Sequence, residues 1–289
     1  MGAHAYAVTS YLSGLAASAF GWYTTYASPS SGSFTPSNRE YLNDAHMDDQ
    51  CLVSASAASG MNVIIDLGSA RQLTGVAILN SNAAVQKTDA AVLVEASSNA
   101  TFAADVNVAK AATTLYSTTT PKNKDHVLQF TANHTKRYWR LTWTWTGTVT
   151  NFVIGELFAF IGATQLSRRS IYGSGESYEA IVSQAPLQYG ETRGLFQAGP
   201  IRQLDLQWDD LTAAQRDELY NMHALSNFGA RPLLWIESYE STVLAAAAAE
   251  QECIYGRLIK PGFQWAHKDF AIYQPGGFSI RSLGREAGA

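Results

Sequence analysis

NVIIDLG at residues 62–68 and ARQLTGVAILN at residues 70–80 decide the fold of this chain. In the first segment the odd-numbered residues from Val63 to Leu67 alternate with Asn62 and Asp66, which is the period of a β-strand with one buried face. The second segment is again apolar, and residues 66–69, DLGS, where the two segments meet, contain two polar residues and a glycine. The pattern predicts two strands joined by a polar turn at residues 66–69.

Residues 138–145, YWRLTWTW, predict a further strand with two unlike faces. One face carries Trp139, Leu141, Trp143 and Trp145, and such a face is either packed in a core or exposed as a platform for sugar rings. We expect burial, because aromatic side chains dominate the packing of β-cores, and the sugar platform is the alternative. The opposite face carries Arg140, Thr142, Thr144 and Thr146.

The first half of the chain resembles the discoidin-like (factor 5/8 type C) module. The resemblance lies in the order of four segments: IDLG at residues 65–68, VAILN at residues 76–80, YWR at residues 138–140 and IGEL at residues 154–157. It implies a jelly-roll β-sandwich over residues 1–161, which is a scaffold for binding or packing. Animal members of the family carry a cysteine pair that this chain lacks, which fits folding in a reducing cytoplasm. The two cysteines present, Cys51 and Cys253, are expected to be unbridged core residues.

The second half has a different pattern. Residues 201–206 alternate as a strand, and Thr212 with Gln215 forms a capping box at the start of a helix. We expect Leu219, Met222 and Leu225 to form the buried stripe of this helix and the helix to end near Gly229. Further strands are predicted at residues 233–236, 253–259, 269–273 and 278–283.

Residues 206–235 resemble a stretch found in tail tube and distal tail proteins of long-tailed bacteriophages: a strand end, one helix, a glycine and a closing strand, RPLLW. The resemblance implies a mainly β protein whose second domain, residues 162–289, is an α+β domain with one helix packed on an antiparallel sheet. The domain boundary is expected within residues 162–177.

Composition narrows the classes of function. The chain has 289 residues, 15% charged residues, a net charge of −4 and no basic run, so direct binding of nucleic acid has little electrostatic support. No segment approaches the ~20 apolar residues that a membrane helix needs. No signal peptide is evident at the N-terminus, and we expect the protein to be made in the bacterial host cytoplasm and to end in the virion tail.

No catalytic, cofactor-binding or metal-binding residue is predicted. The chain has no nucleophile elbow, zinc-protease helix, P-loop or dinucleotide turn, and its six histidines are scattered. The adjacent carboxylates Asp48-Asp49 and Asp209-Asp210 do not form a glycosidase pair by themselves, because neighbouring residues of a strand face opposite ways.

The discoidin resemblance also raises the question of a calcium site. Sugar-binding relatives hold calcium between an acidic loop and an acidic residue near the last strand, and Asp44, Asp48, Asp49 and Glu156 occupy comparable places. A solvated acidic loop explains the same residues, so no metal is predicted.

Two functions remain open. The leading expectation is a structural tail subunit, not an enzyme: a distal tail or baseplate ring around the tail channel, in contact with tail tube, hub and tape-measure proteins, with DNA only as passing cargo. The alternative is a carbohydrate-binding module used in adsorption to a host-surface glycan, with Tyr23, Tyr26 or Phe34 stacking on sugar rings.

Overall fold

The computed structural model describes most of the chain between residues 60 and 167 and shorter segments elsewhere. The described residues are 3–7, 10, 12, 15–16, 19–23, 33–34, 51–53, 60–115, 125–149, 152–167, 175–179, 182–186, 192–196, 201–208, 210–239, 253–259, 265–269, 272–275 and 278–285. The chain forms two compact units. The first contains Met1–Gln165 and Ile236–Cys253, and the second contains Leu166–Trp235 and Ile254–Ala289. The expected boundary between residues 161 and 162 stays a prediction.

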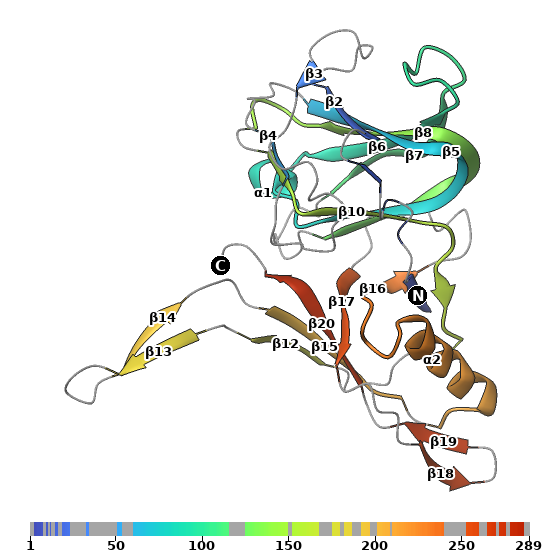
Figure 1. The fold of residues 1–289 in the computed structure, drawn as a ribbon, viewed down its shortest axis with the longest axis vertical. Coiled ribbons are helices and arrows are strands. Elements are labelled where there is room, and N and C mark those ends of the chain that lie inside the picture. Colours follow the sequence, from blue (N-terminus) through green and yellow to red (C-terminus); the bar gives the residue numbers. More distant parts are fainter. Residues whose placement is uncertain are drawn as a thin grey trace. The chain divides into compact units, whose positions relative to one another are not determined.

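The first unit is a β-sandwich built around two long strands, β5 (Gly60–Leu79) and β8 (His126–Thr144) (Figure 1). Its main sheet has the order β3-β2-β5-β8-β6-β7, and β10 pairs with β5 off this path. The remaining elements are β2 (Phe20–Tyr23), β3 (Ser33–Phe34), β6 (Ala91–Ser97), β7 (Asn107–Thr114), β10 (Glu156–Phe160), the short helix α1 (Ala83–Gln86), and β4 (Cys51–Val53), which pairs with β9 (Phe152–Ile154). The fold is mainly β, as expected.

Strands β5 and β8 bend together and take part in both layers of the sandwich (Figure 1). The first half of β5 pairs with the last part of β8, from Gly60 opposite Thr144 to Asp66 opposite Tyr138. The second half, from Gly75, pairs with the first part of β8 and also with β10. The expected turn at residues 66–69 is therefore wrong, because the ladder continues through a register shift between Asp66 and Arg71.

Gly68 explains how the strand bends without reversing. Its φ of +74° lies in the region that favours glycine, and its amide donates to Asp66 Oδ1 over 2.8 Å. A sequence pattern of this kind is typical of a turn, but the partner strand β8 bends at the same level and keeps the two strands paired.

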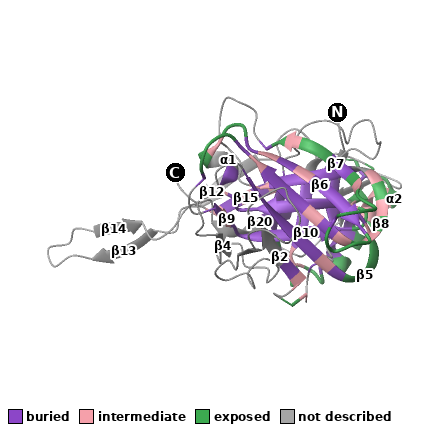
Figure 2. Cartoon of the chain, turned by 90° about the horizontal axis from the view of Figure 1, so that it is seen from above, coloured by how far each residue is buried: buried purple, intermediate pink, exposed green. Residues whose placement is uncertain are grey.

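The tryptophan face of β8 is buried, as expected. Trp139 is 1% exposed and Trp143 is 0% exposed, within a core to which both layers contribute (Figure 2). Trp139 stacks on Phe130 with ring centroids 5.3 Å apart, and Trp143 meets the edge of Phe152 at 5.4 Å. This burial excludes the alternative in which these tryptophans form an open sugar platform.

A second seven-stranded sheet has the order β11-β1-β16-β17-β20-β15-β12. Its strands are β11 (Thr164–Gln165), β1 (Ala3–Ala7), β16 (Leu233–Tyr239), β17 (Cys253–Ile259), β20 (Phe278–Arg285), β15 (Ile201–Leu206) and β12 (Gly175–Glu179). The strands predicted at residues 201–206, 233–236, 253–259 and 278–283 are confirmed.

Two hairpins in the second unit each form a two-stranded sheet: β13 (Val182–Pro186) with β14 (Thr192–Phe196), and β18 (Trp265–Asp269) with β19 (Ile272–Pro275). The strand predicted at residues 269–273 is wrong, because this segment spans the end of β18 and the start of β19. The Ala245–Ala249 run lies outside the described residues.

Helix α2 (Ala213–Leu225) begins with the predicted capping box: the Gln215 amide donates to Thr212 Oγ1 over 3.3 Å, and the Thr212 amide donates to Gln215 Oε1 over 3.0 Å. The helix ends at Leu225, four residues before Gly229. Leu219 and Met222 are buried as expected, whereas Leu225 is 55% exposed. His223 lies four residues after Leu219 and takes the buried place instead, with its ring 5.2 Å from that of Phe278.

Candidate functional site

The strand register gives the sandwich two unlike ends. At one end, Gly60 of β5 lies opposite Thr144 of β8, which lies opposite Ala91 of β6, which lies opposite Thr114 of β7. The described connections that precede β6 and follow β8 therefore meet there. We call this the loop end and define it by its described residues 80–90 and 145–149. The opposite end, where β5 and β8 bend, is the bent end: residues 66–74, 97–107 and 134–137.

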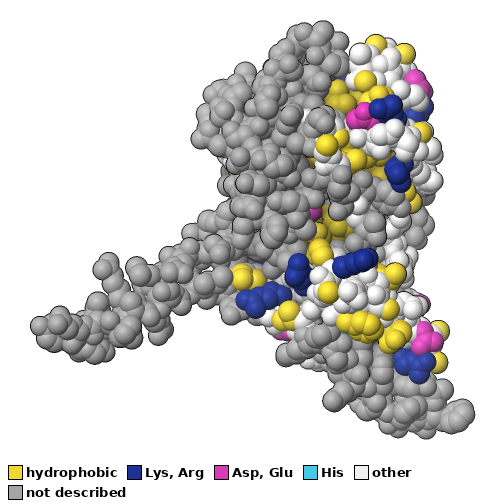
Figure 3. Space-filling view, in the orientation of Figure 1, with side chains coloured by type: hydrophobic (Ala, Val, Ile, Leu, Met, Phe, Trp, Pro, Cys, Tyr) yellow, Lys and Arg dark blue, Asp and Glu magenta, His cyan; other side chains and the backbone are white. Residues whose placement is uncertain are grey.

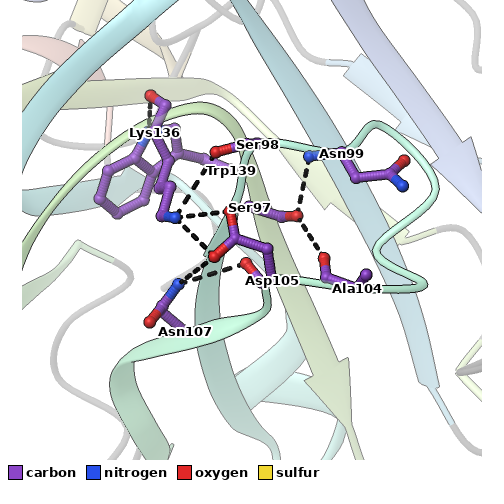
Figure 4. A network of polar contacts seen from close by, with 8 residues as sticks. All are labelled: Ser97, Ser98, Asn99, Ala104, Asp105, Asn107, Lys136 and Trp139. Carbon is purple, nitrogen blue, oxygen red and sulfur yellow. Dashed lines mark hydrogen bonds and ion pairs between the residues drawn. The ribbon is translucent and has the colours of Figure 1, made fainter.

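Ion pairs hold the bent end together. Lys136 Nζ lies 2.6 Å from Asp105 Oδ2 (Figure 4), and Arg137 binds Asp66 through two hydrogen bonds of 2.7 and 2.8 Å. The hydrogen bond from Lys136 lowers the pKa of Asp105 to about 2, and the hydrogen bond from Arg137 lowers the pKa of Asp66. The charged side chains of the bent end therefore pair with one another.

Hydrogen bonds also fix the loop between β6 and β7. The Ser97 hydroxyl donates to the Ala104 carbonyl over 3.0 Å and accepts from the Asn99 amide over 2.9 Å, as Figure 4 shows. Trp139 Nε1 donates to the Lys136 carbonyl over 3.1 Å, which joins the network to the core. The residues that resemble a glycosylation acceptor, Asn99 to Thr101, use the asparagine oxygen within this loop, where it accepts from the Thr101 hydroxyl over 2.8 Å.

A largely buried ion pair of the sheet supports the same loop. Arg140 binds Glu95 on the neighbouring strand, with a shortest distance of 2.7 Å, and their side chains are 14% and 11% exposed. The guanidinium carbon lies 4.4 Å from the ring centre of Phe102. Phe102 has a φ of +51°, an uncommon conformation for a bulky residue, and the loop keeps it over the arginine. This arrangement is structural.

The loop end carries a different polar cluster. Asp89, before β6, accepts the Thr146 amide through Oδ2 over 2.8 Å, and Thr146 follows the end of β8. Hydrogen bonds from Thr146 are the main cause of the lowered pKa of Asp89. Lys87 approaches the next residue, Gly147, so closely that a Cβ on the glycine would lie 3.2 Å from Lys87 Nζ. Two connections about sixty residues apart in sequence thus meet.

The frame beneath this cluster is fixed by backbone contacts of Asn82 and Asn80. Asn82 Oδ1 accepts from the Val153 amide over 2.9 Å, while the Asn82 amide donates to the Val153 carbonyl over 3.2 Å. The Asn80 amide donates to Asp125 Oδ1 over 2.8 Å. Lys87 and Asp89 therefore belong to a turn whose first residues, Asn80 and Asn82, are hydrogen-bonded to neighbouring connections.

Of the residues considered for calcium, the structure describes Glu156 alone. Glu156 lies at the start of β10 opposite Leu79 and is 2% exposed. Asp44, Asp48 and Asp49 lie outside the described residues. Within the described part of the chain, no group of three or more His, Cys, Asp or Glu residues could hold a metal ion.

The remaining residues named from the sequence lie in different parts of the chain. Tyr23 and Phe34 belong to strands β2 and β3, but their side chains, like all of Tyr26, lie outside the description. Cys253 is buried. Burial lowers the pKa of His223 to about 4, so this histidine is neutral at physiological pH. Among the described helices, none is long and apolar enough to cross a membrane.

Sequence reasoning missed the loop-end residues Lys87, Asp89, Thr146 and Gly147. No motif marks them, since QKTDA and TGT are ordinary polar segments. The available signal was the position of both segments beside predicted strands, which becomes informative only when the pairing of β6 with β8 is known.

No known protein-family model and no curated protein matches the chain. Among solved structures, it is similar to chitosan-binding module 1 of a chitosanase/glucanase from Paenibacillus sp. IK-5, with 15% identity, 54% of this chain and 100% of that chain covered, and a TM-score of 0.34. It is also similar to a CBM32 module of a family 31 glycoside hydrolase from Clostridium perfringens, with 13% identity, coverages of 49% and 94%, and a TM-score of 0.33. A third is the CBM32 module of AlyQ in complex with 4,5-unsaturated mannuronic acid, with 22% identity, coverages of 49% and 98%, and a TM-score of 0.29. Similarities at these values carry no argument about what this chain binds.

Proposed function

We propose that the protein binds carbohydrate at the loop end of its β-sandwich. The observation that carries the proposal is the contrast in how the two ends use their polar groups. At the bent end, Lys136 and Arg137 form ion pairs with carboxylates. At the loop end, Lys87 and Asp89 lie on one turn, and Asp89 is hydrogen-bonded to the Thr146 amide. Fixed polar groups on convergent loops are the usual means by which a rigid β-scaffold recognises a polar ligand.

The proposed activity is binding without turnover. A sugar offers many hydroxyl groups, each of which both donates and accepts, so it suits a surface that combines a donor with an acceptor. The buried tryptophans are unavailable to it, and any stacking ring must come from another part of the loop end. The function therefore belongs to the connections, while the strands supply the frame.

A glycan array probed with the whole purified chain tests the proposal. We expect binding to a restricted set of oligosaccharides, reproduced by calorimetry with a soluble member of that set. Variants Lys136→Ala and Asp105→Asn, placed at the bent end, should bind the same set. Absence of binding to every glycan on a broad array, by a chain whose circular dichroism shows a folded β protein, would refute the proposal.

A second candidate, the structural subunit of a bacteriophage tail ring, is favoured by a feature of the second unit. Hairpins β13–β14 and β18–β19 form separate two-stranded sheets within the described residues. Isolated two-stranded hairpins are marginally stable in water, and their edges can pair with another chain. Closed rotational contacts between copies would form a ring. The ring would contact other tail proteins and enclose the DNA channel.

Mass photometry and electron microscopy test this candidate separately from glycan binding. We expect closed rings, either of the chain alone or at the tail end of purified virions. A chain that stays monomeric in solution and is absent from virions would exclude the ring. The two functions are compatible, because they use different units of the chain.

A further inference from the structure

Four residues of the loop end form a cluster that combines a donor with an acceptor. Lys87, Asp89, Thr146 and Gly147 come from two connections. The Thr146 amide holds the Asp89 carboxylate, and Lys87 Nζ lies beside Gly147. The inference rests on the proposed carbohydrate binding and deepens it.

Lys87 is the donor of this cluster. Within the described parts of the chain its ammonium forms no hydrogen bond or ion pair, and its charge acts on the Asp89 carboxyl. Gly147 has a φ of +79° and no Cβ, and the space that a side chain would occupy lies beside Lys87 Nζ. A lysine in this position keeps its three N–H groups for a ligand.

Asp89 is the acceptor. The Thr146 amide donates to Oδ2 over 2.8 Å, and the Thr146 side chain and the Asp89 amide also bind the carboxylate. An ionised carboxylate has about four acceptor sites, so it can accept a further hydrogen bond from a ligand. The carboxylate is ionised at neutral pH because its pKa is lowered, so it accepts and cannot donate. The tie to Thr146 limits its movement and reduces the entropy that a ligand would otherwise have to remove.

Among the described residues, the charges around the cluster disfavour an acidic sugar. The described loop end has one ammonium, Lys87, beside Asp89, with Asp125 and the buried Glu156 at the adjoining strand ends. Elsewhere on the chain, on the face drawn in Figure 3, the described Lys and Arg side chains lie in separate small groups. A carboxylate-bearing sugar would approach Asp89 at a cost.

We propose that Lys87 and Asp89 together bind two adjacent hydroxyl groups of a neutral hexose. One hydroxyl donates to the Asp89 carboxylate, and its neighbour accepts from the Lys87 ammonium. Thr146 and Gly147 are positioning residues: the first holds the carboxylate, and the second leaves room for the ammonium. No bond is made or broken.

The test compares two matched pairs of variants. Lys87→Ala and Asp89→Asn alter the loop end, and Asp89→Asn retains a side-chain oxygen that can accept from the Thr146 amide. Lys136→Ala and Asp105→Asn remove the same kinds of group at the bent end. Each is probed against immobilised galactosides, mannosides, glucosides, chitosan and polygalacturonate, and the affinity for the best soluble oligosaccharide is measured by calorimetry.

We expect neutral hexosides to bind, with affinity reduced about tenfold or more by Lys87→Ala and by Asp89→Asn, since each change removes a charge-assisted hydrogen bond. The bent-end variants should stay within about twofold of the parent chain, as exposed ion pairs contribute little. Gly147→Ala, which places a methyl group beside Lys87 Nζ, should also weaken binding.

Three outcomes would overturn the inference. Binding of polygalacturonate alone contradicts the neutral class. Binding of neutral hexosides that survives both loop-end changes assigns the sugar to other residues and leaves the proposed carbohydrate binding intact. Failure of the parent chain to bind any glycan removes both proposals.

Discussion

The bent end and the loop end of the sandwich use similar residues for different purposes. Both contain a lysine, an aspartate with a lowered pKa and a glycine at positive φ. At the bent end Lys136 lies on Asp105, so the two charges satisfy each other and fix a loop. At the loop end Asp89 is tied to a backbone amide, and Lys87 lies beside Gly147. Residue type alone therefore does not distinguish a structural ion pair from a binding group; the partner does.

Replacing a core tryptophan gives the largest expected effect and tests whether the two ends share one core. Trp143 is fully buried near the loop end and packs on Phe152. We expect Trp143→Ala to lower the free energy of unfolding by about 3–5 kcal/mol, because it removes a large buried side chain and leaves a cavity. Chemical denaturation measures this change.

Trp139→Ala, nearer the bent end, is the matched variant and should cost a similar amount. If either variant kept the stability of the parent chain and instead lost sugar binding, the tryptophan face would be a ligand platform and the contrast between the ends would be misplaced.

The Arg140–Glu95 pair should give an intermediate effect, confined to the bent-end side of the sheet. Arg140→Ala leaves a largely hidden Glu95 carboxylate without its partner and removes the contact with Phe102. We expect a loss of about 2 kcal/mol in unfolding free energy, as for a hydrogen bond to a charged group. A double-mutant cycle with Glu95→Gln isolates the pair.

Glycan binding should be unchanged in Arg140→Ala once the chain is folded. Protease sensitivity of residues 98–106 should rise, since Phe102 loses the group that it covers. Unchanged sensitivity together with unchanged stability would show that this pair does not hold the loop.

Acid should give the smallest effect and should act on the Lys136–Asp105 contact. The pKa of Asp105 is lowered from 3.8 to about 2, so its contribution to stability is present above the unfolded value and is lost as pH falls from about 3.8 through about 2. The Asp105 side chain is 47% exposed, so solvent screens the pair, and we therefore expect only a slight difference in Tm between the parent chain and Asp105→Asn at pH 6.

That difference should shrink as the pH falls to about 2, where the parent carboxyl is half protonated, and vanish below it. Carbon-13 chemical shifts of the carboxyl groups follow the titration directly. A midpoint near 3.8 would show that the ion pair does not form in solution and that the bent end is less tightly held than its geometry indicates.

Local sequence patterns predicted the parts of the fold that depend on one strand or one helix. Alternation in β8 was enough to place Trp139 and Trp143 in the core, and the spacing of Thr212 and Gln215 was enough to predict the cap of α2. Leu225 was misplaced because its position lies off the stripe that contains Leu219, whereas His223, which is polar, lies on it.

Features that depend on distant partners were not predictable. Residues 66–69 have the composition of a turn, and only pairing with β8 makes them part of a continuous strand. Lys87 and Gly147 become neighbours because β6 and β8 are paired with a particular register, which no short segment encodes. The candidate site is therefore a product of the fold, and local motifs carried no information about it.

The shared bend of β5 and β8 also has a consequence for how the sandwich folds. The two strands are far apart in sequence and pair along nearly their whole length, so closing them requires the slow formation of contacts between distant segments. A one-residue slip of either strand would turn its side chains to the wrong faces, in both layers at once. After such a slip, the register shifts beside Asp66 and Leu73 would no longer lie opposite the residues of β8 that accommodate them, which disfavours the slip. We expect the two layers to form in a single cooperative kinetic step.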